Sequence, residues 1–262
     1  MQPLTELQKK IDELERLTIE LQDALQRERK DNSLKSQFIG TAAHEFRTPL
    51  TTILNSADFL GMVGRSCDEE KYREHIAKIQ RAVNYLAEFS EDVLTISKFE
   101  IGNASVKPVH FLLDEFCQNL IEEISGTQGN SHTIEFVFSG ATTALYHDKH
   151  LLQHIVLNLL ENSIKYSFPE TPIVIRAAVT ATHVEISVED HGRGILEEDK
   201  QRLFEPFERG SNNHDTIGTG LGLSIVKKSV DILGGTIIVK SLPNVGTTID
   251  VIIPLVNDTI PQ

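Results

Sequence analysis

One histidine of the chain lies in a segment that suits it for covalent chemistry. His44 is followed directly by Glu45, and Thr48 comes one helical turn later. With Ala43 and Phe46 on the buried seam of a helix, the histidine and the threonine share one outward stripe. An exposed imidazole is largely neutral near pH 7, as a nitrogen nucleophile must be, and an adjacent carboxylate can fix its tautomer. We therefore predict a nucleophilic histidine, with a solvated surface histidine as the alternative.

A second group of polar residues has the spacing of one helix face. Asn158, Asn162 and Lys165 follow one another at intervals of four and three residues. Amide oxygens are suitable ligands for Mg²⁺, and an ammonium group can bind phosphates. The same helix has a complete apolar face, so simple surface polarity explains these three residues poorly.

Two glycine-containing segments complete the candidate chemistry. Asp190 ends a predicted strand before a Gly-x-Gly turn, where its carboxylate can accept a hydrogen bond from an adenine amino group; ordinary turn chemistry is the alternative. Gly218, Gly220 and Gly222 then open a helix, whose free N–H groups and dipole suit a triphosphate. No strand directly precedes them, unlike in the dinucleotide-binding fingerprint.

The first 35 residues carry a seven-residue apolar repeat. At spacings of three and four from Leu4 to Leu25, six of the seven positions are Leu or Ile and the other is Thr18, with mostly charged or polar residues between. This repeat predicts a two-stranded coiled coil over residues 1–35, with a single amphipathic helix as the plainer alternative. Between Lys35 and Ala43 the spacing changes to two consecutive fours, a stutter that locally unwinds a coiled coil and suits the transmission of a signal.

Residues 36–103 are expected to form a helical hairpin. Apolar residues from Ile39 to Leu60 keep a helical spacing up to Gly61, and a second stripe runs from Tyr72 to Val93. One hairpin leaves too wide an apolar stripe to stand alone, so two copies should pair as a dimeric four-helix bundle.

After a linker, residues 108–258 mix helical and strand patterns. Helices are predicted over 111–124, 149–166 and 221–233, and strands over 133–138, 173–179, 184–188, 236–240 and 247–253. We expect an α/β sandwich with one mixed sheet under a helical layer. The fold class of the whole chain is therefore α plus α/β.

Bulk properties limit the partners. The 262 residues carry a net charge of −13, which argues against nucleic acid or an anionic membrane surface. No apolar run is long enough for a membrane helix, and Cys67 and Cys117 read as ordinary reduced thiols. We expect a cytoplasmic protein, either soluble or the cytoplasmic portion of a larger membrane-attached sensor.

Six motifs together resemble those of the sensor histidine kinases of two-component systems, in the same order and spacing from about Ser36 to Pro254. They are the phosphoacceptor box at 38–50, the asparagine box at 158–167, the first glycine box at 190–195, the phenylalanine box at 203–209, the second glycine box at 218–224, and the closing pair Gly246-Thr247. One residue departs from the usual pattern, because His191 stands where the first glycine box commonly has asparagine.

The resemblance implies an ATP- and Mg²⁺-dependent kinase that phosphorylates His44, with Glu45 beside it, and passes the phosphoryl group to an aspartate of a response regulator. It implies a homodimer whose sensor lies upstream of this chain, and it links Thr48 to phosphatase activity on the regulator. Asn158 and Asn162 would bind Mg²⁺, and Arg209 is a candidate for reaching the transferred phosphate, with a solvated loop residue as an equal alternative. The nucleotide-binding residues that it implies are Asn158, Asn162, Lys165, Tyr166, Asp190, Gly192, Gly194, Phe204, Phe207, Gly218, Thr219, Gly220, Leu221, Gly222, Leu223 and Thr247.

The resemblance also gives these residues separate tasks. Lys165 and Tyr166 would contact phosphate and ribose, and Asp190 would accept from the adenine amino group, assisted by Thr247 through water. Residues 196–217 would form a lid, with Phe204 and Phe207 packing its base.

Other classes use the same ATP-binding fold. Gyrase-type, mismatch-repair and chaperone ATPases drive a clamp with it, but they lack an upstream phosphoacceptor helix. Anti-sigma-factor serine kinases share the fold without the dimeric hairpin. A degenerate kinase that only dimerises is a third alternative, against which the intact motifs argue.

Overall fold

The structure is a computed structural model that describes residues 36, 38–62, 68–100, 106–127, 132–140, 144–208, 210 and 218–256. The chain divides into two compact units, Met1–Val83 and Asn84–Gln262. The predicted coiled coil over 1–35 lies outside the described residues. Of the helices that the structure does describe, none has the length and apolar character needed to cross a bilayer.

Two long helices follow each other in the first part of the chain, as the sequence predicts. The first, α1, covers residues 38–62, and α2 spans Glu69–Glu100. Along α1 the buried positions recur every seven residues, at Ala42, Pro49 and Ser56. The predicted seam residues Ile39 and Leu50 are instead 68% and 53% exposed. A single hairpin therefore leaves an apolar stripe of α1 uncovered.

The second unit contains a mixed five-stranded sheet in the order β2-β4-β5-β7-β6. β2 and β4 run parallel, and the other neighbours are antiparallel. The strands are β2 (Ile134–Gly140), β4 (Ile173–Val179), β5 (His183–Asp190), β6 (Thr236–Leu242) and β7 (Gly246–Pro254).

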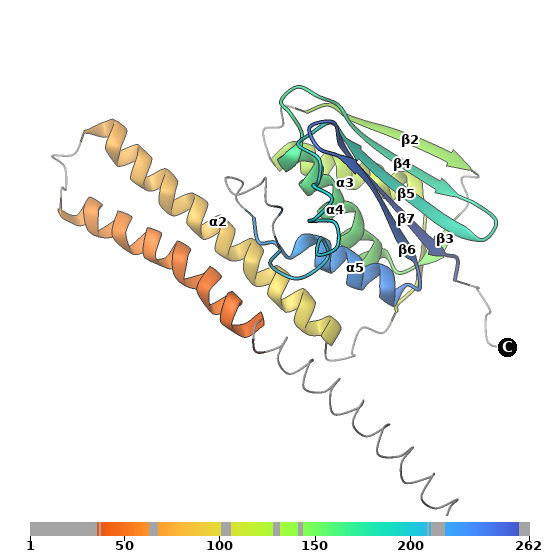
Figure 1. Cartoon of the computed structure of the whole chain (residues 1–262), viewed down its shortest axis with the longest axis horizontal. Helices are drawn as coiled ribbons and strands as arrows, with labels where there is room; N and C mark the ends of the chain where they lie inside the picture. Colours follow the sequence, from red (N-terminus) through yellow and green to blue (C-terminus); the bar gives the residue numbers. More distant parts are fainter. Residues whose placement is uncertain are drawn as a thin grey trace, which may run out of the picture. The chain divides into compact units, whose positions relative to one another are not determined.

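Three helices cover one face of this sheet (Figure 1): α3 (Leu113–Thr127), α4 (Lys149–Tyr166) and α5 (Gly222–Ile232). Alternate residues of β4, β5 and β7 point into this layer, which is why Ile175, Ile186 and Val251 are almost completely buried. They pack with the apolar face of α4 into one continuous core. Each such side chain contributes about 1.5–3 kcal/mol of burial free energy, and together they fix the height of α4 above the sheet.

A small two-stranded sheet was not expected from the sequence. β1 (Val109–Phe111) pairs antiparallel with β3 (Leu145–His147), and α3 consequently begins at Leu113 rather than at Phe111. Strands of three residues are too short to show an alternating pattern, so only their pairing reveals them.

Candidate nucleotide-binding site and phosphoacceptor

Helix α4 positions the first group of candidate residues. Its N-terminus is capped by Asp148, whose Oδ1 accepts hydrogen bonds from the N–H groups of His150 and Leu151 at 3.0 Å. The apolar face of the helix is buried against the sheet, and Asn158 and Asn162 line a cavity that α4 shares with the ends of β5 and β7. Asn158 Nδ2 donates to the His154 carbonyl at 2.8 Å, which fixes the amide orientation.

The glycines of the second glycine box leave room for these side chains. A Cβ at Gly222 would lie 2.5 Å from Asn158 Oδ1, and a Cβ at Gly218 would overlap the Lys165 ammonium. Side chains at these two positions would therefore push the amide oxygen and the ammonium out of place. The start of α5 and one face of α4 thus bring an amide oxygen, a cation and helix N–H groups together. This donor set fits a triphosphate with a hard divalent cation.

The other end of the cavity is formed by the ends of β5 and β7. Asp190 pairs with Thr247 across the two strands, and the Thr247 N–H donates to Asp190 Oδ1 at 3.3 Å. Burial raises the pKa of Asp190 to about 6, while hydrogen bonds from the Thr247 and Gly192 N–H groups act in the opposite direction. A partly buried carboxylate with acceptor capacity is suited to an amino group of a base.

Most of the predicted nucleotide-binding residues line this one cavity. They are Asn158, Asn162, Lys165, Tyr166, Asp190, Gly194, Thr219, Gly220, Gly222, Leu223 and Thr247.

Five predicted residues lie beside the cavity without lining it: Gly192, Phe204, Phe207, Gly218 and Leu221. Two of them have clear supporting positions. Leu221 is fully buried beneath the start of α5, and a Cβ at Gly192 would overlap the Tyr166 carbonyl oxygen. Arg209 and residues 211–217 of the predicted lid lie outside the described residues.

Phe207 joins the described part of the lid to the second glycine box. Its backbone N–H donates to the Gly220 carbonyl at 2.9 Å, and its φ of 66° lies in the left-handed region that side chains other than glycine rarely adopt. Its ring centroid lies 6.3 Å from that of the fully buried Phe89 of α2. The lid base is therefore held both through its backbone and through its side chain.

Sequence reasoning missed several acidic residues that line the cavity in addition to Asp190. Glu88 and Asp92, from the part of α2 that belongs to the second unit, line it together with Glu161 of α4. Thr219 of the glycine box donates a hydrogen bond to Asp92 Oδ2 at 2.7 Å. Burial raises the pKa of Asp92 to about 6, against the lowering effect of this hydrogen bond. No local sequence signal marks Asp92, because its partner stands 127 residues further along the chain.

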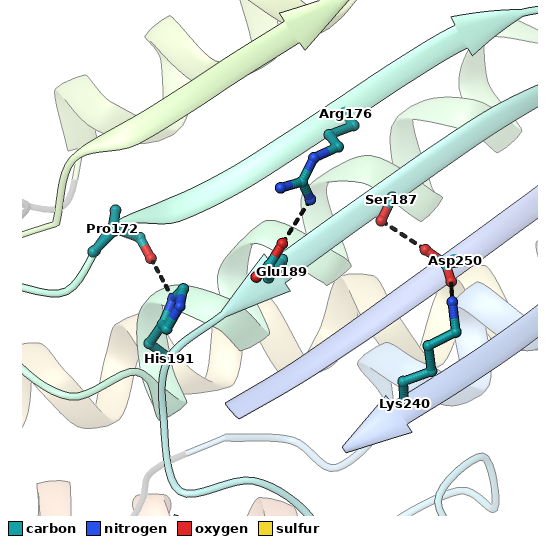
Figure 2. Close-up of polar contacts among 7 residues, drawn as sticks. All are labelled: Pro172, Arg176, Ser187, Glu189, His191, Lys240 and Asp250. Carbon is teal, nitrogen blue, oxygen red and sulfur yellow. Dashed lines mark hydrogen bonds and ion pairs between the residues drawn. The ribbon is translucent and has the colours of Figure 1, made fainter. Parts of the chain in front are cut away.

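His191, the one departure from the usual motif, contacts the segment that precedes β4. Its Nδ1 lies 3.3 Å from the Pro172 carbonyl oxygen, as Figure 2 shows, and it is not among the described residues that line the cavity. The same view shows the polar pairs on the strands, including Arg176 with Glu189. The described contact of this histidine is thus with the segment before β4.

The candidate phosphoacceptor is accessible on α1. The His44 side chain is 71% exposed, and Glu45 Oε1 lies 4.0 Å from its Nδ1. Thr48 is also exposed, with its Oγ1 3.4 Å from the His44 carbonyl oxygen. At 4.0 Å the carboxylate is beyond hydrogen-bond distance of Nδ1, and a small movement of the side chain would let it hold a proton on Nδ1 and leave the Nε2 lone pair for attack.

Comparisons with known proteins match both parts of the chain. The His Kinase A (phospho-acceptor) domain family matches residues 34–102, and the histidine kinase-, DNA gyrase B- and HSP90-like ATPase family matches residues 147–257. The chain is 32% identical over 252 residues to the virulence sensor protein BvgS of Bordetella bronchiseptica. The alignment covers 92% of this chain but only 20% of BvgS, so the chain spans about a fifth of the length of that relative.

Solved structures share the fold. A complex of histidine kinase ThkA with the response regulator protein TrrA has a TM-score of 0.66 at 24% identity, over 87% of this chain and 64% of that chain. Full-length ShkA in complex with AMPPNP has a TM-score of 0.62 at 23% identity, and the match covers 85% of this chain and 46% of the ShkA chain. Two family matches in this order, and a relative aligned along almost the whole chain, agree with the motifs and the cavity. The chain therefore belongs to the sensor histidine kinases of two-component systems and carries their phosphoacceptor domain followed by their ATP-binding domain.

Proposed function

We propose that this chain transfers the γ-phosphoryl group of ATP to Nε2 of His44 and then to an aspartate of a separate response regulator. The observation that carries the proposal is the pairing of an exposed, carboxylate-flanked histidine with a cavity suited to a triphosphate in one chain. In domain terms, residues 1–35 would transmit the signal, residues 36–103 would dimerise and accept the phosphoryl group, and residues 108–258 would bind ATP.

The chemistry requires mainly positioning. The Nε2 lone pair forms a bond to the γ-phosphorus while the bond to the β,γ-bridging oxygen breaks, and ADP leaves with that electron pair. Glu45 holds the proton on Nδ1 and stabilises the imidazole as it becomes positive. Lys165 and the N–H groups at the start of α5 offset the phosphate charge.

A magnesium ion, held by the amide oxygens of Asn158 and Asn162, would neutralise the phosphates further. Asp190 and Thr247 would bind the base, and Tyr166 would contact the ribose. We also propose that Arg209 contacts the transferred phosphate and that Phe204 packs the base of the lid.

The exposed apolar stripe of α1 supports a homodimer. Ile39, Leu50 and Leu54 are exposed and lie on one side of the helix, with exposed Tyr72 and Val83 on one side of α2. Two hairpins that cover these stripes mutually would form the expected four-helix bundle. A response regulator as the second partner is supported by the ThkA complex, which joins a kinase of this fold to such a protein.

The proposal is tested by incubating the chain with ATP labelled at the γ position. We expect a label on the protein that is stable to alkali and lost in acid, as a phosphohistidine is. His44→Gln should abolish it while ATP affinity, measured by calorimetry, stays unchanged, because the cavity residues belong to other elements. Label on another histidine would contradict the assignment, and free phosphate without labelled protein would indicate a clamp-type ATPase instead.

A further inference from the structure

A row of three polar side chains crosses the sheet beside the base end of the cavity. Asp190 of β5 is the direct partner of Thr247 of β7, which in turn is the direct partner of Ser241 of β6. Directly paired residues of neighbouring strands point to the same face of a sheet. Asp190 and Thr247 line the cavity, whereas Ser241 stands behind them. Ser241 and Thr247 are only 8% and 9% exposed.

The Ser241 hydroxyl makes three hydrogen bonds. It donates to the Gly246 carbonyl at 3.0 Å and accepts from the Ile195 N–H at 2.9 Å. Its oxygen also lies 2.9 Å from Thr247 Oγ1, a contact in which either hydroxyl can donate. These bonds connect β6, β7 and the turn that follows Gly194.

The hydrogen count of a serine hydroxyl decides the direction of the third bond. A hydroxyl has one hydrogen and two acceptor lone pairs. The hydrogen of Ser241 is used on Gly246, and the Ile195 N–H uses one lone pair. Thr247 must therefore donate its own hydrogen to the remaining lone pair of Ser241.

This assignment sets the chemical character of the wall that meets the base. With its hydrogen committed to Ser241, the hydroxyl of Thr247, a residue that lines the cavity, has only lone pairs to offer a ligand. The carboxylate of Asp190 beside it is an acceptor as well. Two acceptors beside the six position match the N–H groups of a 6-amino purine, whereas the carbonyl oxygen of a 6-oxo purine would meet only lone pairs at that position.

We propose that Ser241 is a specificity-determining residue for the nucleotide, because it fixes the Thr247 hydroxyl as an acceptor and thereby selects 6-amino over 6-oxo purines. The inference rests on the proposed ATP site. Ser241 acts through Thr247 and does not itself touch the nucleotide. Sites that commit buried polar groups to one hydrogen-bond pattern reject a ligand of the opposite pattern strongly, which gives one hydroxyl a measurable effect.

The test compares the binding of ATP and of inosine triphosphate, which differ only at the six position and the adjoining ring nitrogen. Dissociation constants of both are measured by calorimetry with Mg²⁺ for the wild type, Ser241→Ala and Ser241→Thr. We expect Ser241→Ala to lower the preference for ATP by about threefold to tenfold, because the Thr247 hydroxyl can then turn and donate to the 6-oxo group. Ser241→Thr, which keeps a hydroxyl, should retain the preference.

A second pair of variants separates this role from a structural one. In Thr247→Val no hydroxyl remains to be oriented, so adding Ser241→Ala should leave the preference of that variant unchanged. The proposal would be overturned if Ser241→Ala weakened the binding of both nucleotides equally. It would also be overturned if Ser241→Ala changed the preference equally in the wild type and in Thr247→Val.

Two further outcomes are also decisive. If circular dichroism shows that Ser241→Ala does not fold, Ser241→Cys decides: its thiol is a weak acceptor, so an unchanged preference there would also contradict the inference. A wild type that binds neither nucleotide would instead contradict the proposed ATP site.

Discussion

At the scale of single residues, Asp190 must satisfy two opposed demands. Its carboxylate is needed as an acceptor for the base, yet burial makes the charged form costly and raises its pKa to about 6. A raised folded-state pKa means that the folded protein holds the proton more tightly than the unfolded chain. Without bound nucleotide, the protein therefore has a lower free energy of unfolding above pH 6 than a variant that lacks this charge. The difference disappears as the pH falls toward 4.

Asp190→Asn is accordingly expected to stabilise the free protein at pH 8 while it weakens ATP binding about tenfold to a hundredfold, since an amide can turn its N–H₂ toward the adenine amino group. Thermal unfolding at pH 8 and pH 4 tests the first effect, and calorimetry with ATP the second. In the wild type, ATP affinity should also fall as the pH drops through 6. Glu189→Gln, whose carboxylate pairs with Arg176 instead, is the control and should leave ATP affinity unchanged.

Thr48 is the residue to test for phosphatase activity. It is exposed one turn after His44, where its hydroxyl can hold a water in line with a phosphoaspartate of a docked regulator. Thr48→Ala should keep self-phosphorylation and lose most dephosphorylation of the phosphorylated regulator. Thr51→Ala is the matched control, because Thr51 is exposed on the same stripe and bonds its own helix in the same way. Parallel loss of both activities in Thr48→Ala would show that the threonine is structural.

At the scale of elements, α2 brings negative charge into the cavity that a triphosphate must enter. Asp92 accepts the hydroxyl hydrogen of Thr219, in the loop expected to hold the phosphates, and Glu88 and Glu161 line the same space. The Asp92 carboxylate and the phosphates would therefore compete for the donors of the glycine loop, and their negative charges would repel each other.

Asp92→Asn should strengthen ATP binding severalfold at pH 8, since asparagine keeps an acceptor for Thr219 without the charge. The gain should shrink at pH 5.5, because Asp92, with a pKa of about 6, is then largely protonated in the wild type. Titration of both proteins with ATP at the two pH values measures this. The control is Glu91→Gln, one residue away and exposed; an equal gain there would mean that the effect is only general charge.

The sequence predicts those elements that carry a long or strong local signal. Helix α4 and strand β4 have the predicted bounds, because a long apolar helix face marks the first and a short run of mostly apolar residues marks the second. The strands β1 and β3 are too short for any period. Within the site, the resemblance of the motifs to the family points to the glycines and Asp190, whereas Asp92 and Ser241 belong to no motif. Their roles depend on partners brought close by tertiary packing, which leaves no spacing rule in the sequence.

At the scale of the whole molecule, the proposed dimer rests on the uncovered stripe of α1. Leu50→Glu combined with Leu54→Glu would place charges where the second hairpin should pack, and we expect a monomer by analytical ultracentrifugation. Nucleotide binding should persist, since none of the described cavity residues lies on α1. Asn55→Glu, on the solvent-facing side of the same helix, is the control and should remain dimeric. A dimeric double variant would place the interface elsewhere.

The backbone of Phe207 has a consequence for how the lid and the glycine loop move. Its left-handed conformation costs about 1–3 kcal/mol and persists only while the surroundings hold it, chiefly through the bond from its N–H to the Gly220 carbonyl. A change of the Phe207 backbone to an ordinary conformation would remove that bond, which is one link between the described lid residues and the glycine loop. We therefore expect the residues around Phe207 and the second glycine box to move together when a nucleotide binds or leaves, so that the order of the one segment depends on the order of the other.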